Sequence, residues 1–307
     1  MNKIILFLLF GLLMGCTSKP PAEKYPDKLV IGFPVGSEAA YWNKIFIPFR
    51  EYLKKTLRLK SVDLFTSTDY AAIIEAMKTK KVDVAYFGEL AYIIAHEKAG
   101  AEPMLMLKTK DDSPLPTNSI IITYPGSGIT SMEDVRKRSH ELTIVFADPA
   151  SASGHLYPRD FLNSIGLDPE KSFKQVVFSQ GHAEAILSIV SHKTDLACTF
   201  IGMPNYMIYK GKLSPTDYVV IWTSKPYPSA PVSIRKDLPE GFKKQVKQAY
   251  LDLPEKDPAV WKNMVHILGM FYPKNVQDKM IYGETADSIY DPIRKVAQEM
   301  PYTNFTK

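Results

Sequence analysis

The sequence has little cysteine, and neither its histidines nor its cysteines have the spacing of a metal site. Only two of the 307 residues are cysteine, which excludes a disulfide framework. The six histidines are scattered, and the chain has no His-x-x-x-His, Cys-x-x-Cys, P-loop or Gly-x-Ser-x-Gly motif. We therefore predict no metal site, no cofactor and no enzymatic activity.

The chain also lacks a block of basic residues. Its 38 basic and 33 acidic side chains give a net charge of +5 that is spread along the sequence. Binding to a nucleic-acid backbone needs clustered lysine and arginine, so this distribution argues against nucleic acid as the main partner. The hydrophobic fraction of 45% is ordinary for a soluble globular protein, and the length predicts about two domains.

No hydrophobic run is long enough to span a membrane. The apolar run Ile4–Met14, which follows Lys3, is too short for a spanning helix but has the length of a signal peptide. It ends in Leu13-Met14-Gly15-Cys16, which resembles a bacterial lipobox. We predict a signal peptide over residues 1–16, lipidation at Cys16 and a polar tether over 17–27, so that the protein is anchored in the cell membrane and faces the periplasm or the cell exterior. The alternative is a buried N-terminal strand with a chance cysteine.

The remaining sequence alternates between short apolar runs and amphipathic helices, which predicts an α/β fold with mainly parallel sheets. The predicted strands are 28–33, 61–65, 82–86, 118–124, 143–146, 175–178, 195–200 and 218–223. The predicted helices between them are 42–57, about 69–77, 88–98, 155–165 and 182–190, and the stretch 241–307 is predicted to be dominantly helical. Pro48 is expected to kink the first helix or to delay its start. Cys198 lies in an apolar run and is predicted to be a small core residue.

Two successive β-α series predict two domains with a cleft between them. We place residues 28–121 and 226–307 in a discontinuous first domain and residues 122–225 in an inserted second domain. Two chain crossings then form a two-stranded hinge.

Motifs along nearly the whole mature chain resemble the phosphonate-binding periplasmic proteins of ABC transporters. They include Thr68-Asp69-Tyr70, Val82-Asp83-Val84-Ala85, Phe87-Gly88, Ser151-Ala152-Ser153-Gly154, Gly181-His182-Ala183-Glu184-Ala185 and Tyr290-Asp291-Pro292. The resemblance implies a type II periplasmic binding-protein fold and a monomer that delivers a small oxyanion (phosphonate, phosphite or phosphate) to an ABC transporter permease. An alternative is a sensor or surface-interaction lipoprotein that keeps the binding-protein fold.

The loop Ser151-Ala152-Ser153-Gly154 lies between a strand and a helix, where backbone N–H groups and the helix dipole favour an anion. We predict that Ser151, Ala152 and Ser153 bind the ligand, although Ala152 replaces a hydroxyl residue that the family usually carries. A plain helix N-cap is the alternative role for such a serine.

The other predicted ligand-binding residues are His182, Tyr70, Tyr86 and Gly88. His182 begins a second helix, with a surface histidine as the alternative, and the two tyrosines offer phenolic O–H donors from the opposite domain, with ordinary aromatic packing as their alternative. Ser153 and His182 have no third partner that would make them a catalytic triad.

The segment Thr199-Phe200-Ile201-Gly202 carries no acid where relatives that bind aminoalkyl phosphonates have one. We therefore predict a ligand with no essential amine. Glu89 leaves this question open, because it either pairs with an amine in the cleft or favours the dipole of the helix that follows Gly88.

Overall fold

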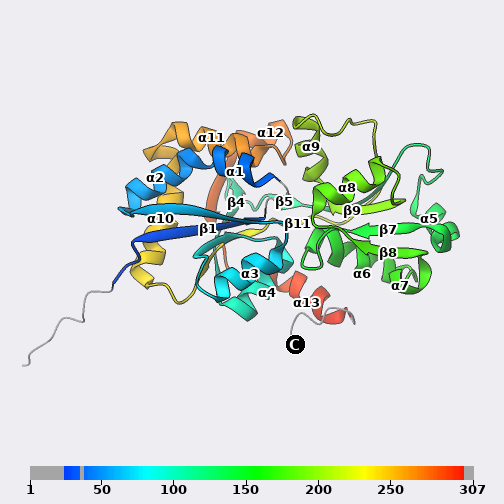
Figure 1. The fold of residues 1–307 in the computed structure, drawn as a ribbon, viewed down its shortest axis with the longest axis horizontal. Coiled ribbons are helices and arrows are strands. Elements are labelled where there is room, and N and C mark those ends of the chain that lie inside the picture. Colours follow the sequence, from blue (N-terminus) through cyan, green and yellow to red (C-terminus); the bar gives the residue numbers. More distant parts are fainter. Residues whose placement is uncertain (1–23, 35–37, 301–307) are drawn as a thin grey trace, which may run out of the picture.

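The computed structural model describes residues 24–34 and 38–300, which form two α/β lobes that lie side by side (Figure 1). Cys16 and the predicted signal peptide lie outside the described residues. No helix in the described ranges is long and apolar enough to cross a membrane.

The first lobe is built on a six-stranded sheet in the order β13-β4-β12-β3-β1-β2. Its strands are β1 Lys28–Pro34, β2 Ser61–Ser67, β3 Val84–Tyr86, β4 Ala101–Thr109, β12 Pro231–Arg235 and β13 Met280–Glu284. Its helices are α1 Ala39–Ile45, α2 Ile47–Leu57, α3 Tyr70–Lys78, α4 Glu89–Ala99, α10 Glu240–Lys256, α11 Pro258–Gly269, α12 Lys274–Gln277, η4 Asp287–Tyr290 and α13 Asp291–Glu299.

The second lobe is built on a five-stranded sheet in the order β10-β6-β9-β7-β8. Its strands are β6 Ser119–Thr123, β7 Thr143–Phe146, β8 Gln175–Phe178, β9 Leu196–Phe200 and β10 Val219–Thr223. Its helices are α5 Met132–Arg138, η2 Ser139–Glu141, the π-helical turn η3 Ala152–Leu156, α6 Tyr157–Ser164, α7 Pro169–Ser172, α8 His182–Val190 and α9 Gly202–Tyr209.

Two short strands, β5 Pro116–Thr117 and β11 Tyr227–Pro228, pair with each other where the chain passes between the lobes. This pairing confirms the two-stranded connection expected from the sequence. The predicted boundary between residues 121 and 122 is wrong, however, because it falls inside β6, which already pairs with β9 and β10 of the second sheet. The first crossing therefore lies at about residues 116–118.

The sheets are mixed, so the prediction of mainly parallel sheets is wrong. Strands β1, β2 and β3 pair in parallel, but β12 runs antiparallel to both β3 and β4. The reason is the path of the chain, since β4 leads toward the second lobe and β12 returns from it. The C-terminal stretch also contributes β13, a strand at the edge of the first sheet that the helical expectation for residues 241–307 did not include.

Local sequence signals explain where several helices begin. Pro48 lies in the first turn of α2, and Phe46 separates α1 from α2. Asp69 caps α3, because its carboxylate accepts a hydrogen bond from the Ala72 N–H at 2.8 Å. Cys198 is fully buried in β9, as predicted.

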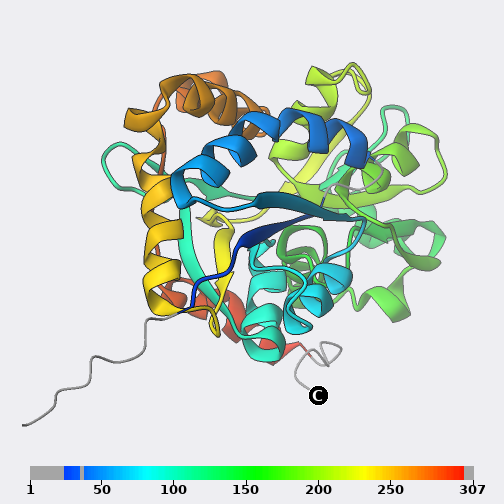
Figure 2. The ribbon, with the colours of Figure 1, turned by 60° about the vertical axis from the view of Figure 1, so that its left-hand side comes forward.

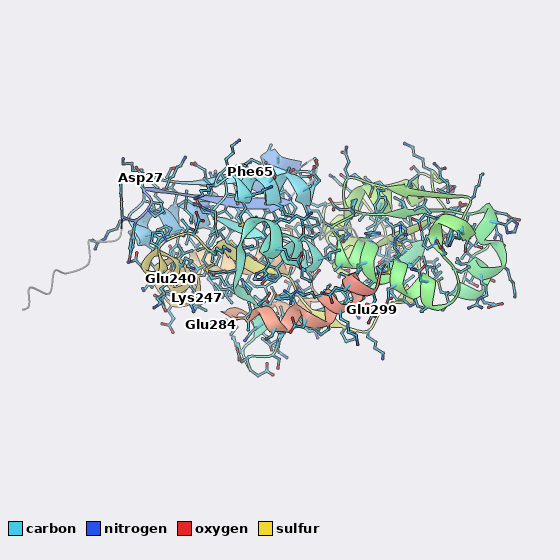
Figure 3. The ribbon with its side chains drawn as sticks, turned by 90° about the horizontal axis from the view of Figure 1, so that it is seen from below. Asp27, Phe65, Glu240, Lys247, Glu284 and Glu299 are labelled. Carbon is cyan, nitrogen blue, oxygen red and sulfur yellow. The ribbon has the colours of Figure 1, made fainter. Side chains whose placement is uncertain are left out.

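Helices cover both faces of the first sheet, and each face has its own hydrophobic core. Helices α2, α10 and α11 pack on one face around Phe49, Leu53 and Tyr250 (Figure 2). Helices α3, α4 and α13 pack on the other face around Ile73 and neighbouring side chains. Seen from below, α13 runs toward the second lobe and brings Glu299 to the junction (Figure 3). The lobes are therefore in contact at their base as well as through the two crossing strands.

Candidate ligand-binding site

The loop after β7 turns directly into a helix and leaves several backbone donors without partners from their own helix. Ser151 begins this turn, and its Oγ accepts a hydrogen bond from the Gly154 N–H at 2.9 Å. The N–H groups of Ala152 and Ser153 belong to the first turn of η3, which has no preceding helical carbonyl for them. Since η3 continues into α6, the helix dipole adds positive potential at the same place.

A buried network that the sequence analysis did not predict holds this loop in place. His155 contacts the Pro149 carbonyl oxygen through Nδ1 at 2.8 Å, and its Nε2 accepts a hydrogen bond from Arg159 Nε at 2.8 Å. Arg159 is 2% exposed and forms an ion pair with Glu170. Burial lowers the pKa of His155 to about 4, so it is a neutral bridge between the loop and α6.

His182, the first residue of α8, is neutral as well. Its Nδ1 lies 3.0 Å from Thr199 Oγ1, and its Nε2 lies 3.3 Å from Ser151 Oγ. Burial lowers the pKa of His182 to about 4. Ser151 is thus the N-cap of the turn and a neighbour of His182, which agrees with the capping alternative for this residue.

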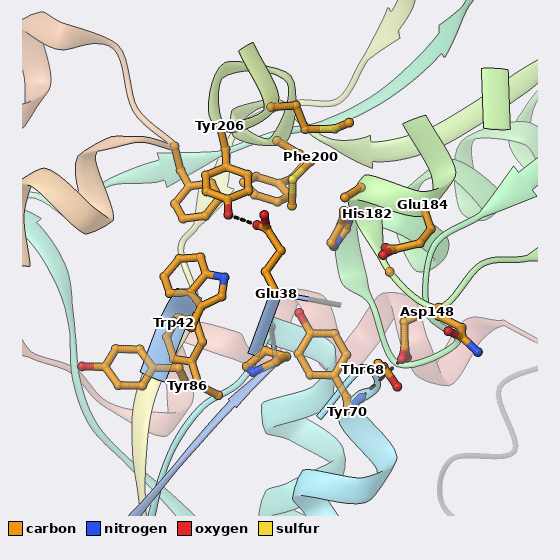
Figure 4. Close-up of a pocket in the computed structure, with 18 of the residues that line it drawn as sticks. Glu38, Trp42, Thr68, Tyr70, Tyr86, Asp148, His182, Glu184, Phe200 and Tyr206 are labelled. Atoms are coloured by element: carbon orange, nitrogen blue, oxygen red, sulfur yellow. Dashed lines mark hydrogen bonds between the residues drawn. The ribbon is translucent and has the colours of Figure 1, made fainter. Parts of the chain in front are cut away.

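The first lobe contributes Tyr70 to the candidate site. It begins α3, and its N–H donates to Asp148 Oδ2 of the second lobe at 3.3 Å. Figure 4 shows the Tyr70 ring on the side of the cleft opposite His182. Gly88 gives Tyr70 its place, because a Cβ on Gly88 would lie 2.8 Å from Tyr70 Oη. The structure therefore gives Gly88 the role of making room for the tyrosine.

Tyr86 faces the cleft with its ring, but its hydroxyl is used elsewhere. Tyr86 Oη lies 3.0 Å from Tyr282 Oη in the aromatic core of the first lobe. This hydrogen bond favours the packing alternative for Tyr86 over the predicted role as a phenolic donor to the ligand.

The cleft contains two adjoining chambers, which we name after their acidic residues. The Glu38 chamber, of about 260 Å³, is lined mainly by aromatic side chains such as Trp42, Phe200 and Tyr206. The Glu89 chamber, of about 200 Å³, is lined by Tyr70, Tyr86, Gly88, Ser153 and His182 among the predicted residues. Ser151 and Ala152, although predicted to bind the ligand, line neither chamber and are buried. Both volumes are below the roughly 300–1,000 Å³ of sites for drug-sized molecules, which favours a small ligand.

The two lobes contact each other across the Glu38 chamber. Glu38 of the first lobe accepts hydrogen bonds from Tyr206 and from Lys212, the latter at 2.9 Å, and both donors belong to the second lobe (Figure 4). Tyr206 also stacks on Phe271 with ring centroids 5.0 Å apart. The residues that the structure describes contain no cluster of histidine, cysteine and acidic side chains that could hold a metal ion.

Comparison with known proteins decides which family this two-lobed architecture represents. Residues 34–273 match the family described as ABC transporter, phosphonate, periplasmic substrate-binding protein. The chain belongs to this family. The phosphonates-binding periplasmic protein of Escherichia coli (strain K12) is 27% identical over 253 residues, which cover 81% of this chain and 74% of the relative.

Solved structures of the phosphonate-binding family share the fold. A binding protein component of an ABC phosphonate transporter from Pseudomonas aeruginosa superposes with a TM-score of 0.76 at 24% identity and covers 89% of this chain and 86% of its own. PhnD1 from Prochlorococcus marinus (MIT 9301), in complex with methylphosphonate, has a TM-score of 0.71 at 22% identity and covers 89% of this chain and 98% of its own. The predicted type II periplasmic binding-protein fold is confirmed.

The Glu89 chamber is also lined by residues that the family motifs in this sequence did not indicate. Thr117 comes from a crossing strand, Ser229 follows the other crossing strand, and Tyr272 follows α11. Thr117 lies in a two-residue strand, Ser229 and Tyr272 lie in irregular segments, and the three have no recognisable spacing. A prediction of their position would have required the path of the hinge, which the sequence pattern located only to within a few residues.

Proposed function

We propose that this substrate-binding protein captures a small phosphorus oxyanion, such as a phosphonate, phosphite or phosphate, in the Glu89 chamber. The observation that carries the proposal is the meeting of Ser153 and the first turn of η3, His182 and Tyr70 at one small chamber between the lobes. Neutral N–H and O–H donors and a helix N-terminus suit an anion, because they direct positive potential toward it. The names of the Escherichia coli protein and of the methylphosphonate complex of PhnD1 support this ligand class.

Capture proceeds by closure of the two lobes about β5 and β11, without chemistry. The donors come from both lobes, since Tyr70 lies on α3 and Ser153 and His182 lie in the second lobe. A ligand that contacts both lobes stabilises the closed arrangement, which is the physical basis of hinge-type binding. The loaded monomer then delivers its ligand to an ABC transporter permease.

The ligand class is tested by thermal unfolding of a soluble form that begins at Lys19, with phosphate, phosphite, methylphosphonate, aminoethylphosphonate and sulfate in separate samples. A ligand at about 100 times its Kd is expected to stabilise the protein by about 2.7 kcal/mol. We expect this shift with at least one phosphorus oxyanion and not with sulfate. No shift with any of the phosphorus compounds, together with binding to a protein partner, would favour the sensor or surface-interaction alternative.

We also propose that Cys16 carries the membrane anchor, on the basis of the short apolar run and the sequence Leu13-Met14-Gly15-Cys16. Two or three acyl chains on one residue hold a soluble domain stably at a membrane. The Cys16→Ala variant is expected to leave the membrane fraction or to remain unprocessed, whereas Cys198→Ala is the control that keeps the anchor. Normal processing and membrane retention of Cys16→Ala would refute lipidation at this residue.

A further inference from the structure

Glu89 is a buried carboxyl group inside the proposed binding chamber. It begins α4 directly after Gly88, and only 7% of its surface is exposed. Its side chain lines the same chamber as Ser153, His182 and Tyr70. Backbone N–H groups of Glu89 itself and of Ala230 donate hydrogen bonds to its carboxylate. Glu89 therefore both occupies the first turn of α4 and faces the cleft.

The chamber around Glu89 is lined mainly by aromatic and apolar side chains and by no positive side chain. The residues that line the chamber include no lysine or arginine, and His182 is neutral because burial lowers its pKa to about 4. Asp148, which contacts the Tyr70 N–H, is a second buried carboxyl group whose pKa is raised by burial. The remaining titratable groups that face Glu89 are tyrosines, and its charge helps to raise the pKa of each: Tyr70, Tyr157, Tyr227, Tyr272 and Tyr290.

Two hydroxyl groups beside this carboxyl group have room for an additional partner. The Tyr227 and Ser229 side chains are buried, and neither hydroxyl has a hydrogen-bond partner among the described residues. Tyr227 belongs to the second crossing strand, β11, and Ser229 follows it, next to Ala230. Of the two residues, Ser229 lines the chamber, which thus offers an unused donor to an anion together with a carboxyl group that repels an anion whenever it is ionised.

An anion bound beside an ionised Glu89 is disfavoured, because like charges at a buried site of low dielectric repel each other. Burial already raises the pKa of Glu89 to about 7, and a bound anion raises it further. Neutralisation of the carboxyl group by a proton from solvent removes the repulsion and turns an acceptor into a hydrogen-bond donor.

We propose that Glu89 is a specificity-determining residue: the chamber accepts the oxyanion only when the Glu89 carboxyl group is protonated. When the ligand binds protein in which Glu89 is ionised, one proton from solvent therefore enters the chamber with it. This inference rests on the proposed function of the same chamber. A protonated Glu89 selects purely anionic ligands over zwitterionic ligands, because the cationic group of a zwitterion would favour the ionised carboxylate. The lack of an acid in the segment 199–202 agrees with the same selectivity.

The test is isothermal titration of the wild type and the Glu89→Gln variant with methylphosphonate at about pH 6 and about pH 8. Between these values we expect the wild-type affinity to fall about tenfold more than that of Glu89→Gln, because the amide imitates the protonated acid and does not titrate. Any titration of methylphosphonate itself is common to both proteins. Glu97→Gln, the same change at an exposed position of α4, is expected to follow the wild type.

Proton uptake on binding gives a second readout for the same two proteins. At about pH 8, titrations in two buffers of different ionisation enthalpy should show close to one proton more taken up by the wild type than by Glu89→Gln.

Three results would overturn the inference, and they have different meanings. Equal pH dependence and equal proton uptake in both proteins would remove Glu89 from the recognition of the ligand. An aminoethylphosphonate affinity at least about tenfold above that of methylphosphonate, lost in Glu89→Gln, would make Glu89 the partner of an ammonium group. If the wild type binds no phosphorus oxyanion at either pH, the proposed function itself fails.

Discussion

Ser153 shows how little charge the proposed site uses. Its side chain is 4% exposed, it lines the Glu89 chamber, and its neighbours in the site are a neutral histidine and a tyrosine. Since no cation lines the chamber, each neutral donor carries a large share of the attraction for an anion. Single hydroxyl deletions should therefore be visible in the affinity.

Replacement of Ser153 by alanine removes one hydroxyl donor to a charged ligand, which costs about 1.5–3 kcal/mol. We expect the affinity for methylphosphonate to fall about tenfold to a hundredfold, as measured by isothermal titration. Ser164→Ala, an exposed serine at the end of α6, is the matched control and should bind like the wild type. A loss of less than about twofold for both Ser153→Ala and Ser151→Ala would move the site elsewhere.

Glu89 should also control how the stability of the free protein depends on pH. Burial raises its pKa from 4.5 to about 7, so the folded state binds more protons than the unfolded state between these values. The free energy of unfolding therefore falls as pH rises through this window, by roughly 3 kcal/mol in total. Denaturant unfolding of Glu89→Gln should lack this loss, so its advantage over the wild type should grow from about pH 4 to about pH 8. A constant difference across that range would show that Glu89 does not titrate there.

At the scale of elements, the anion loop depends on a support that lies behind it. The segment from β7 to α6 is held by the chain of contacts from Pro149 through His155 and Arg159 to Glu170. Arg159 also lies over the Phe146 ring at the end of β7, 4.9 Å from its centroid. One buried side chain thus joins the strand, the loop and the helix that together present Ser153.

Replacement of Arg159 by methionine keeps the bulk but breaks a buried polar network. We expect the free energy of unfolding to fall by about 1–3 kcal/mol, because the buried His155 Nε2 loses its donor. Urea denaturation measures this loss. Arg136→Met, an arginine on α5 whose side chain is 52% exposed, is the control and should change stability by less than about 1 kcal/mol. Equal effects of the two substitutions would contradict a supporting role for Arg159.

The sequence predicted which segments become strands and helices better than it predicted how they meet. Residues 175–178 and 182–190 form the strand and the helix expected there, because hydrophobic periodicity is a local signal. Strand direction is not local, so the antiparallel return of β12 and the edge strand β13 were missed. In the site, the positions of Ser153, His182 and Tyr70 followed from motifs. The burial of Glu89 and the diversion of the Tyr86 hydroxyl to Tyr282 depend on side chains far away in the sequence.

For the whole molecule, one tight contact between the lobes is made at Gly202. This residue begins α9 of the second lobe, and a Cβ on it would lie 2.3 Å from the carbonyl oxygen of Phe271 in the first lobe. Beside it, Phe200 and Phe271 are in contact with ring centroids 5.7 Å apart. The absence of a side chain at position 202 therefore permits the closed arrangement that we propose for ligand capture.

The Gly202→Ala variant should keep both lobes folded but hold them apart. We expect at least about a tenfold loss of affinity for methylphosphonate and, in small-angle X-ray scattering with saturating ligand, a larger radius of gyration than that of the wild type. Ile201→Ala changes the preceding exposed residue and should affect neither measurement. If Gly202→Ala binds and compacts like the wild type, closure does not pass through this contact.

The position of β12 between β3 and β4 also has a consequence for the order in which the chain folds during export. All strands of the five-stranded sheet lie within residues 119–223, whereas the six-stranded sheet lacks one of its inner strands until residue 235 has emerged. A polypeptide that leaves a translocation channel from its N-terminus therefore completes the inserted lobe first. Strands β1 to β4 meanwhile keep unpaired edges, which is the state of a chain most exposed to aggregation. We therefore expect a chain that folds in this order to be most prone to aggregation while residues 101–235 emerge, before the returning strand closes the gap.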